Sequence, residues 1–120
     1  MKSTVVIGLL AASIAYAQPV SFIDDDLPVL ENAGCKHSHN PDGVASGTRL
    51  HFPDESASRQ RIAAFGESVV ELVNRSAPST SILLQKPTNR VKHSGGEKIP
   101  KGSPEEATLT RWIGYLASVP

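Results

Sequence analysis

One short segment holds the residue types most able to do chemistry, a thiol and two imidazoles within five positions. It reads Cys35-Lys36-His37-Ser38-His39. In a helical turn, residues three and four positions apart share a face, so Cys35, Ser38 and His39 would address one ligand and His37 would point elsewhere. In an extended segment, alternate residues share a face, so Cys35, His37 and His39 would form a ligand set suited to copper or zinc. The residues alone leave both arrangements open.

The helical arrangement matches the signature for covalent haem attachment, C-x-x-C-H, in all but one position. Cys35 and His39 occupy the first cysteine and the histidine of that signature, and Ser38 stands where its second cysteine belongs. A serine hydroxyl cannot form a thioether. Haem would therefore be attached through Cys35 alone, or the module would carry no haem.

The N-terminus predicts export from the cytoplasm. Lys2 precedes an apolar run from Val5 to Ala15, and Ala15-Tyr16-Ala17 is a small-x-small cleavage site, as in a secretory signal peptide. The run has about 11 residues, against roughly 20 for a membrane-spanning helix, so we expect no membrane span after cleavage. We therefore predict a signal peptide over residues 1–17, one domain over residues 18–120, and a periplasmic or secreted location.

The single cysteine needs an explanation in such an oxidising compartment. Cys35 has no second cysteine in the chain with which to form an intramolecular disulfide. A lone cysteine in a secreted protein indicates intermolecular pairing or a reactive group, and attachment to a cofactor is a third option.

The charge pattern argues against bulk nucleic-acid binding. Without Lys2 the chain has a net charge of −1, with −5 over residues 18–58 and +5 over residues 59–101. This polarity could orient a redox partner, or it could reflect solvated faces of different sign. No Ser/His/Asp order, paired-carboxylate motif or phosphate-binding glycine loop stands out, so we do not expect an enzyme.

Helical signals separated by long loops predict an all-α fold. A first helix should begin with Ser21 as its N-cap and run to about Asn32, and Pro28 should confine or bend it. Ala33-Gly34 should stop this helix and place Cys35 just past its end.

Three more helical segments are expected farther along the chain. A region over residues 57–74, capped by Ser56, has apolar residues at helical spacing and could be broken at Gly66. A short helical piece is expected over residues 81–84. The clearest start signal is Ser103-Pro104-Glu105-Glu106, with serine at the N-cap, proline at N1 and glutamate at N3.

The first and last helices should pack together, because each has an apolar face inside the domain. The residues of these faces are Leu27 and Leu30 on the first helix, and Leu109, Trp112 and Leu116 on the last. We therefore expect residues 18–120 to fold on their own.

Several segments match a known pattern when they are taken together. They are Leu27-Pro28-Val29-Leu30, Ala33-Gly34-Cys35, Ser38 to Gly43, Ser81 to Leu84, Lys86-Pro87-Thr88, His93-Ser94-Gly95-Gly96, Gly102 to Glu106 and Leu109 to Ile113. In these segments the chain resembles small c-type cytochrome modules of the planctomycete and acidobacterial secreted type. The resemblance covers nearly all of residues 18–120 and departs from the family pattern at Ser38.

The resemblance implies a small cytochrome c-like helical domain with long loops, in which the first and last helices pack near a haem. It implies that Cys35 carries the haem, that Ser38 is the lost second attachment position, and that His39 is the proximal iron ligand. The second axial ligand is not methionine, because Met1 is the only methionine and leaves with the signal peptide. His93 is the candidate distal ligand, since its segment resembles the family's His-Gly-Gly.

Other polar residues are candidates for secondary contacts with the haem. Arg49, Lys86 and Arg90 could pair with haem propionates or could form a solvated basic face. His37 and His51 are weaker candidates for coordination.

The predicted function is electron transfer through haem c, attached singly, with a redox protein or a neighbouring domain as partner. Ligation by two histidines would give a lower reduction potential than His/Met ligation. Two alternatives stay open at this point. One is a haem-free structural module, and the other is a Cu/Zn-binding module through Cys35, His37 and His39.

Overall fold

The structure is a computed structural model that describes residues 20–120. Over that range it has five α-helices, two 3₁₀ helices, one π-helix and no strand, which confirms the all-α prediction there. The expected signal peptide, residues 1–17, lies outside the described residues. No helix within residues 20–120 has both the length and the apolar character that crossing a bilayer requires.

The first helical segment begins where the sequence predicts but opens with an unexpected wide turn. η1 (Phe22–Asp26) is a π-helix, and α1 (Leu27–Asn32) continues it directly. The hydroxyl of Ser21 accepts a hydrogen bond of 3.2 Å from the backbone N–H of Asp24, so Ser21 is the N-cap. Pro28 is the second residue of α1 and has no N–H to donate to the preceding turn, in keeping with the change from π to α geometry there.

α1 ends at the predicted place, and the segment with the thiol and imidazoles forms a new helical turn. Gly34 has φ +74°, a left-handed conformation that a residue without Cβ adopts at no steric cost. α2 (Cys35–Ser38) is a single turn, and His39 follows as its C-cap. The extended arrangement weighed from the sequence, with Cys35, His37 and His39 on one face, is therefore wrong for this structure.

The second predicted region is helical, but its start differs by two residues. α3 (Arg59–Ser68) begins after Ser58, whose hydroxyl accepts a 3.1 Å hydrogen bond from the N–H of Arg61. Ser58 rather than Ser56 is therefore the N-cap. α3 then tightens into the 3₁₀ helix η2 (Val69–Leu72).

α3 continues through Gly66 without a break. Glycine is needed at this position because another helix packs closely against it. A Cβ on Gly66 would lie 2.3 Å from the ring of Phe22, so the missing side chain lets η1 approach α3. The carbonyl of Gly66 also accepts a 3.0 Å hydrogen bond from the indole N–H of Trp112. Gly66 thus joins three segments that are far apart in the sequence.

Two of the three remaining elements, the short helix near residues 81–84 and the last helix after Ser103, lie at the predicted positions, and the 3₁₀ helix before them was not predicted. η3 (Pro78–Thr80) precedes α4 (Ile82–Gln85), and α5 (Pro104–Ser118) is the longest helix of the described chain. The hydroxyl of Ser103 accepts a 3.2 Å hydrogen bond from the N–H of Glu106, which confirms the predicted cap.

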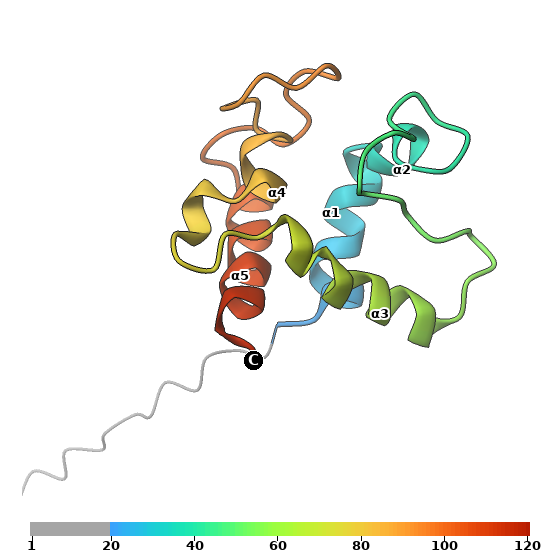
Figure 1. Ribbon diagram of the computed structural model, residues 1–120, viewed down its shortest axis with the longest axis horizontal. Helices are drawn as coiled ribbons and strands as arrows, with labels where there is room; N and C mark the ends of the chain where they lie inside the picture. The colour runs from blue at the N-terminus through green and yellow to red at the C-terminus, as the bar shows by residue number, and fades with distance from the viewer. Residues whose placement is uncertain (1–19) are drawn as a thin grey trace, which may run out of the picture.

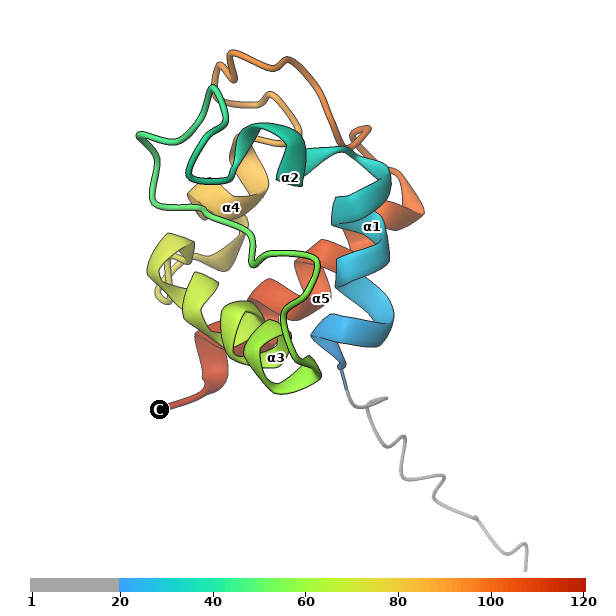
Figure 2. The ribbon, with the colours of Figure 1, turned by 90° about the vertical axis from the view of Figure 1, so that its right-hand side faces the viewer.

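The helices pack around one apolar core, to which the loop of residues 86–101 adds Ile99. η1 and α1 both pack against α5, as predicted for the first and last helices. Both views place the loops of residues 39–50 and 86–101 at the end of the molecule opposite α3 (Figures 1 and 2). The buried apolar residues are Phe22, Leu30, Phe52, Phe65, Val69, Leu83, Leu84, Ile99, Leu109, Trp112, Ile113 and Leu116.

Candidate functional site

A cavity of about 670 Å³ lies where α2 and α4 meet the two loops. Its volume is in the range of small-molecule and cofactor sites. Its apolar wall includes Leu30, Leu50, Leu72, Ile82 and Leu83.

Six of the candidate residues chosen from the sequence line this one cavity. They come from α2, from α4's C-terminal end and from both loops, and they are Cys35, Ser38, His39, Arg49, Lys86 and His93. The fold therefore brings together residues that the sequence separates by more than fifty positions. His37 is not among the lining residues and is exposed.

A short hydrogen-bonded chain orients the ring of His39. The Nδ1 atom of His39 lies 3.0 Å from the hydroxyl oxygen of Thr48, and that hydroxyl donates its own hydrogen to the carbonyl of Ala45 at 2.7 Å. Because the Thr48 hydrogen is used in this way, Nδ1 of His39 must be the donor, and its Nε2 carries a lone pair. Burial lowers the pKa of His39, so the ring is neutral at pH 7.

The ring of His93 is held in the same tautomer by its own loop. Its Nδ1 lies 2.8 Å from the carbonyl oxygen of Gly96, which can only accept, so Nδ1 carries the hydrogen and Nε2 is free. The backbone N–H of Gly96 donates to the carbonyl of His93 at 2.8 Å, and the N–H of His93 donates to the side chain of Asn89 at 2.9 Å. Such bonds on the second nitrogen are typical of histidines that ligate metals.

The two imidazoles form a matched pair across the cavity. The ring centroids of His39 and His93 are 6.4 Å apart, and the ring planes are parallel within 7°. Both rings line the cavity, and each has Nε2 as its free nitrogen. The pair can offer two nitrogen ligands to one acceptor. Among residues 20–120, no group of three or more His, Cys, Asp or Glu side chains is arranged to hold a metal ion by itself.

Cys35 and Ser38 lie on the same helical turn and line the same cavity. Cys35 is a free, half-buried thiol. Burial raises its pKa, so Cys35 is a thiol rather than a thiolate at neutral pH. The wall thus carries one sulfur and, three positions later on the same turn, one hydroxyl.

The basic candidates divide into two groups. Arg49 and Lys86 line the cavity, and the ammonium of Lys86 also donates to the carbonyl of Lys92 at 2.7 Å. Arg90 does not line it. Its guanidinium forms a two-pronged ion pair with Glu106 of α5, and this hydrogen bonding lowers the pKa of Glu106 to about 2.

Two site residues were missed by reasoning from the sequence. Thr48 orients His39, and Lys98 lines the cavity close enough to Cys35 for its charge to oppose, in part, the rise of the thiol pKa. The sequence separation between each of them and the residue that it contacts or influences matches no known motif. Only their basic or hydroxyl character, in loops next to His39 and His93, could have drawn attention to them.

Comparison of the chain with models of known protein families, with curated proteins and with solved structures gives no match.

Proposed function

We propose that this protein is an electron-transfer module that holds one haem, attached through Cys35 and ligated by His39 and His93. The observation that carries the proposal is the pair of parallel imidazoles, both with a free Nε2, in one cavity with the single thiol. Haem iron takes two axial ligands beyond the four nitrogens of its ring, and paired histidines are a common choice.

The separation of the two imidazoles fits ligation of one metal from opposite sides. A metal-bound imidazole nitrogen lies about 2 Å from the metal and the ring centroid about 1.2 Å farther out, so two opposed ligands put their centroids roughly 6.4 Å apart. The observed centroid distance is 6.4 Å. The centroid separation therefore matches the spacing of two imidazoles on one metal.

The donor set also fits the covalent part of the proposal. Cys35 would add its sulfur to one vinyl group and its hydrogen to the neighbouring carbon, which converts the double bond to a single bond and needs no oxidant. Ser38 can make no such bond, so one thioether is the most that α2 can supply. Arg49, Lys86 and Lys98 line the cavity and could pair with the acidic groups of the same ligand.

The arrangement favours electron transfer over catalysis. Haem, when bound, supplies a one-electron redox couple. His39 and His93 would both hold the iron, and the apolar wall would limit access of water. We therefore propose a secreted or periplasmic redox module whose partner is another redox protein or a neighbouring domain.

Loading in a host that matures c-type cytochromes tests the proposal. The purified protein should keep a Soret band after denaturation, and its mass should rise by one haem on the peptide that contains Cys35. His93→Ala should leave the attachment in place but convert the spectrum from six-coordinate low-spin to one that responds to added imidazole.

His37→Ala is the matched control, because His37 is exposed on the same turn as Cys35. It should leave both loading and spectrum unchanged. If His37→Ala instead abolished zinc or copper binding, the metal-site alternative would replace the haem proposal. A colourless protein of unchanged mass would leave the haem-free structural module as the better description.

A further inference from the structure

The aromatic side chains of the described chain form one continuous series of contacts. The ring centroids of Phe52 and Phe65 are 4.8 Å apart, and those of Phe65 and Phe22 are 5.7 Å apart. Trp112 follows at 5.6 Å from Phe22, and Tyr115 at 4.7 Å from Trp112. Centroid separations of this size are typical of aromatic rings in contact. All the phenylalanine, tryptophan and tyrosine residues of positions 20–120 belong to this series.

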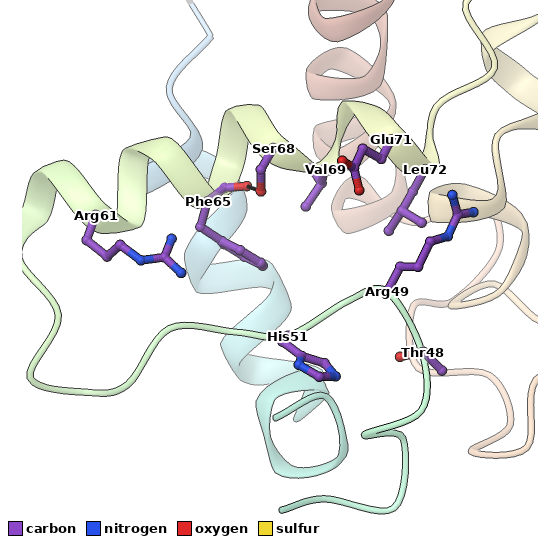
Figure 3. Close-up of a pocket in the computed structure, with 9 residues that line it drawn as sticks. All are labelled: Thr48, Arg49, His51, Arg61, Phe65, Ser68, Val69, Glu71 and Leu72. Carbon is purple, nitrogen blue, oxygen red and sulfur yellow. Dashed lines mark hydrogen bonds between the residues drawn. The ribbon is translucent and has the colours of Figure 1, made fainter. Parts of the chain in front are cut away.

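The series runs from the large cavity to the surface of the molecule. The backbone N–H of Phe52 donates to the carbonyl of His39 at 2.8 Å, and His39 lines that cavity. Phe65 also borders a second cavity, of about 380 Å³, between the α3–η2 segment and the loop of residues 48–51. Figure 3 shows its ring extending from α3 towards the loop that holds His51. At the other end of the series Tyr115 is half-buried, whereas the other four rings are buried.

Tyr115 has a strong proton acceptor within reach, whereas the partner of Trp112 is a weak one. The phenolic hydroxyl of Tyr115 donates to Oε1 of Glu67 at 2.8 Å. This hydrogen bond, with burial and the negative charge of Glu67, raises the pKa of Tyr115, so the phenol keeps its proton at neutral pH. The indole N–H of Trp112 donates to the backbone carbonyl of Gly66 at 3.0 Å, and a carbonyl is a far weaker base than a carboxylate. Since loss of an electron makes a phenol strongly acidic, the nearby carboxylate favours oxidation of Tyr115 over Trp112.

We propose that Trp112, Tyr115 and Glu67 form a proton-coupled redox relay, which carries oxidation of the buried indole to the surface. The co-reactant is a radical that accepts one electron, and it takes that electron from Trp112. Tyr115 then gives one electron to Trp112, and its phenolic proton passes to Glu67. One O–H bond breaks on Tyr115 and one forms on Glu67. The products are a neutral indole, a neutral tyrosyl radical and a protonated carboxyl group.

The phenylalanine end of the series gives the relay a place in the redox module, and this part rests on the proposed function. Iron held by His39 would lie at the end of the series that begins with Phe52. Ferrous iron is a stronger reductant than a phenol, so it would return an electron to oxidised Trp112 across the packed phenylalanine rings. When the iron is ferric, that electron would come from Tyr115.

Pulse radiolysis of the haem-free full chain tests the relay directly. The oxidant is the azide radical, which oxidises indole in preference to phenol at neutral pH. The absorbance of the tryptophan radical should decay while that of the tyrosyl radical rises, with one rate constant that does not depend on protein concentration. The transfer should be slower in heavy water, because the proton moves with the electron. A rate proportional to protein concentration would mean transfer between molecules and would overturn the relay.

Two substitutions, each with a matched control, assign the residues. Tyr115→Phe should abolish the transfer, and Tyr16→Phe, at the other tyrosine of the chain, should leave it unchanged. Glu67→Gln keeps a hydrogen-bond acceptor but removes the base, so it should slow the transfer at least about tenfold. Glu71→Gln, four positions later in η2, should leave the rate at the parent value. Transfer that survives Tyr115→Phe, or equal rates and isotope effects in the parent and Glu67→Gln, would contradict the proposal.

The relay and the proposed function fail in different ways. A protein that shows the transfer but takes up no haem retains the relay and loses electron transfer through haem. In the ferrous, haem-loaded protein, decay of the tryptophan radical should instead match the appearance of ferric haem. Tyrosyl radical that forms there at the haem-free rate would overturn the connection between the relay and the cavity.

Discussion

Ser38 stands where the proposed haem attachment would need a second thiol, and serine differs from cysteine by a single atom. Its side chain lines the same cavity as Cys35 and follows it by three positions on α2. Ser38→Cys would therefore present a second thiol to the same ligand, and covalent haem incorporation should rise several-fold. Haem content of the denatured protein, by absorbance and mass, measures the change.

Ser46→Cys is the control for adding a thiol elsewhere, because Ser46 is exposed and lines neither cavity. It should leave incorporation at the parent level. Equal incorporation by the parent and by Ser38→Cys would contradict the placement of Ser38 beside the ligand.

Asp26 is a second residue with a measurable consequence. Its side chain is 2 % exposed, and its Oδ1 has no hydrogen-bond partner within residues 20–120. Burial, reinforced by the charge of Asp25 and opposed by Arg111, raises the pKa of Asp26 from 3.8 to about 7. The folded protein thus holds this proton more tightly than the unfolded chain, so the free energy of unfolding should fall as pH rises from about 4 to about 7.

Asp26→Asn should remove that decline and raise the free energy of unfolding at pH 8 by on the order of 2–4 kcal/mol. Urea unfolding at pH 5 and pH 8 measures it. Glu31→Gln, at an exposed position on α1, should retain the pH dependence of the parent. Parallel pH profiles for the parent and Asp26→Asn would show that another group controls the effect.

The candidate site was predictable where its residues are close in sequence. Cys35, Ser38 and His39 share a turn, and helical spacing alone suggests that they act together. The placement of His93 opposite His39 depends on how two loops meet, which no local spacing encodes. The ion pair of Arg90 with Glu106 of α5 likewise depends on tertiary packing and has no local signal in the sequence.

At the scale of elements, Gly66 is where three helical segments meet. Gly66→Ala would put a Cβ 2.3–2.8 Å from the side-chain atoms of Phe22, so η1 would have to move away from α3. We expect a loss of about 1–3 kcal/mol in the free energy of unfolding, as for overpacked cores. Thermal or urea unfolding measures it.

Gly114→Ala provides the opposite case, because a Cβ at Gly114 meets nothing within 4 Å and the residue lies inside α5. It should stabilise the protein by about 0.5–1 kcal/mol, the usual gain for alanine over glycine in a helix. Similar effects of the two substitutions would argue against the packing of Phe22 on Gly66.

The elements were predictable where their signals are local. Ser21 and Ser103 each cap a helix through their own side chains, and both starts agree with the sequence. The start of α3 was misplaced because Ser56 and Ser58 are equally good caps by type. Ser56 bonds Asp54 instead, through both its N–H and its hydroxyl. The π-turn of η1 carries no recognisable local signal.

At the scale of the whole molecule, buried side chains are distributed unevenly. Residues 36–51 and 89–98 contribute none, whereas α5 contributes Leu109, Trp112, Ile113 and Leu116. In the haem-free protein, amide hydrogens of α5 should therefore exchange slowly and those of the two loops quickly. Haem loading should slow exchange in both loops, which are the segments that it would contact directly.

Fluorescence of Trp112, which is 4 % exposed, is the complementary measurement. A blue-shifted emission with a cooperative transition is expected for haem-free residues 18–120, because Trp112 packs on Phe22 and its indole N–H donates to the carbonyl of Gly66, both outside the cavity loops. A solvent-like emission without a transition would mean that the core itself needs the ligand.

His39 and His93, the parallel pair in the cavity, are 54 positions apart in the chain. A ligand bound by both histidines would close the intervening segment into a ring, as a disulfide does. The chain has one cysteine and can form no internal disulfide. By the chain-entropy relation for cross-links, closing a loop of about 54 residues lowers the conformational entropy of the unfolded chain. This loss is equivalent to a free energy on the order of 4 kcal/mol. The ring would contain α3, η2, η3 and α4. A haem bound by both histidines would then also cross-link the two loops. Its dissociation would remove the constraint on both loops at once.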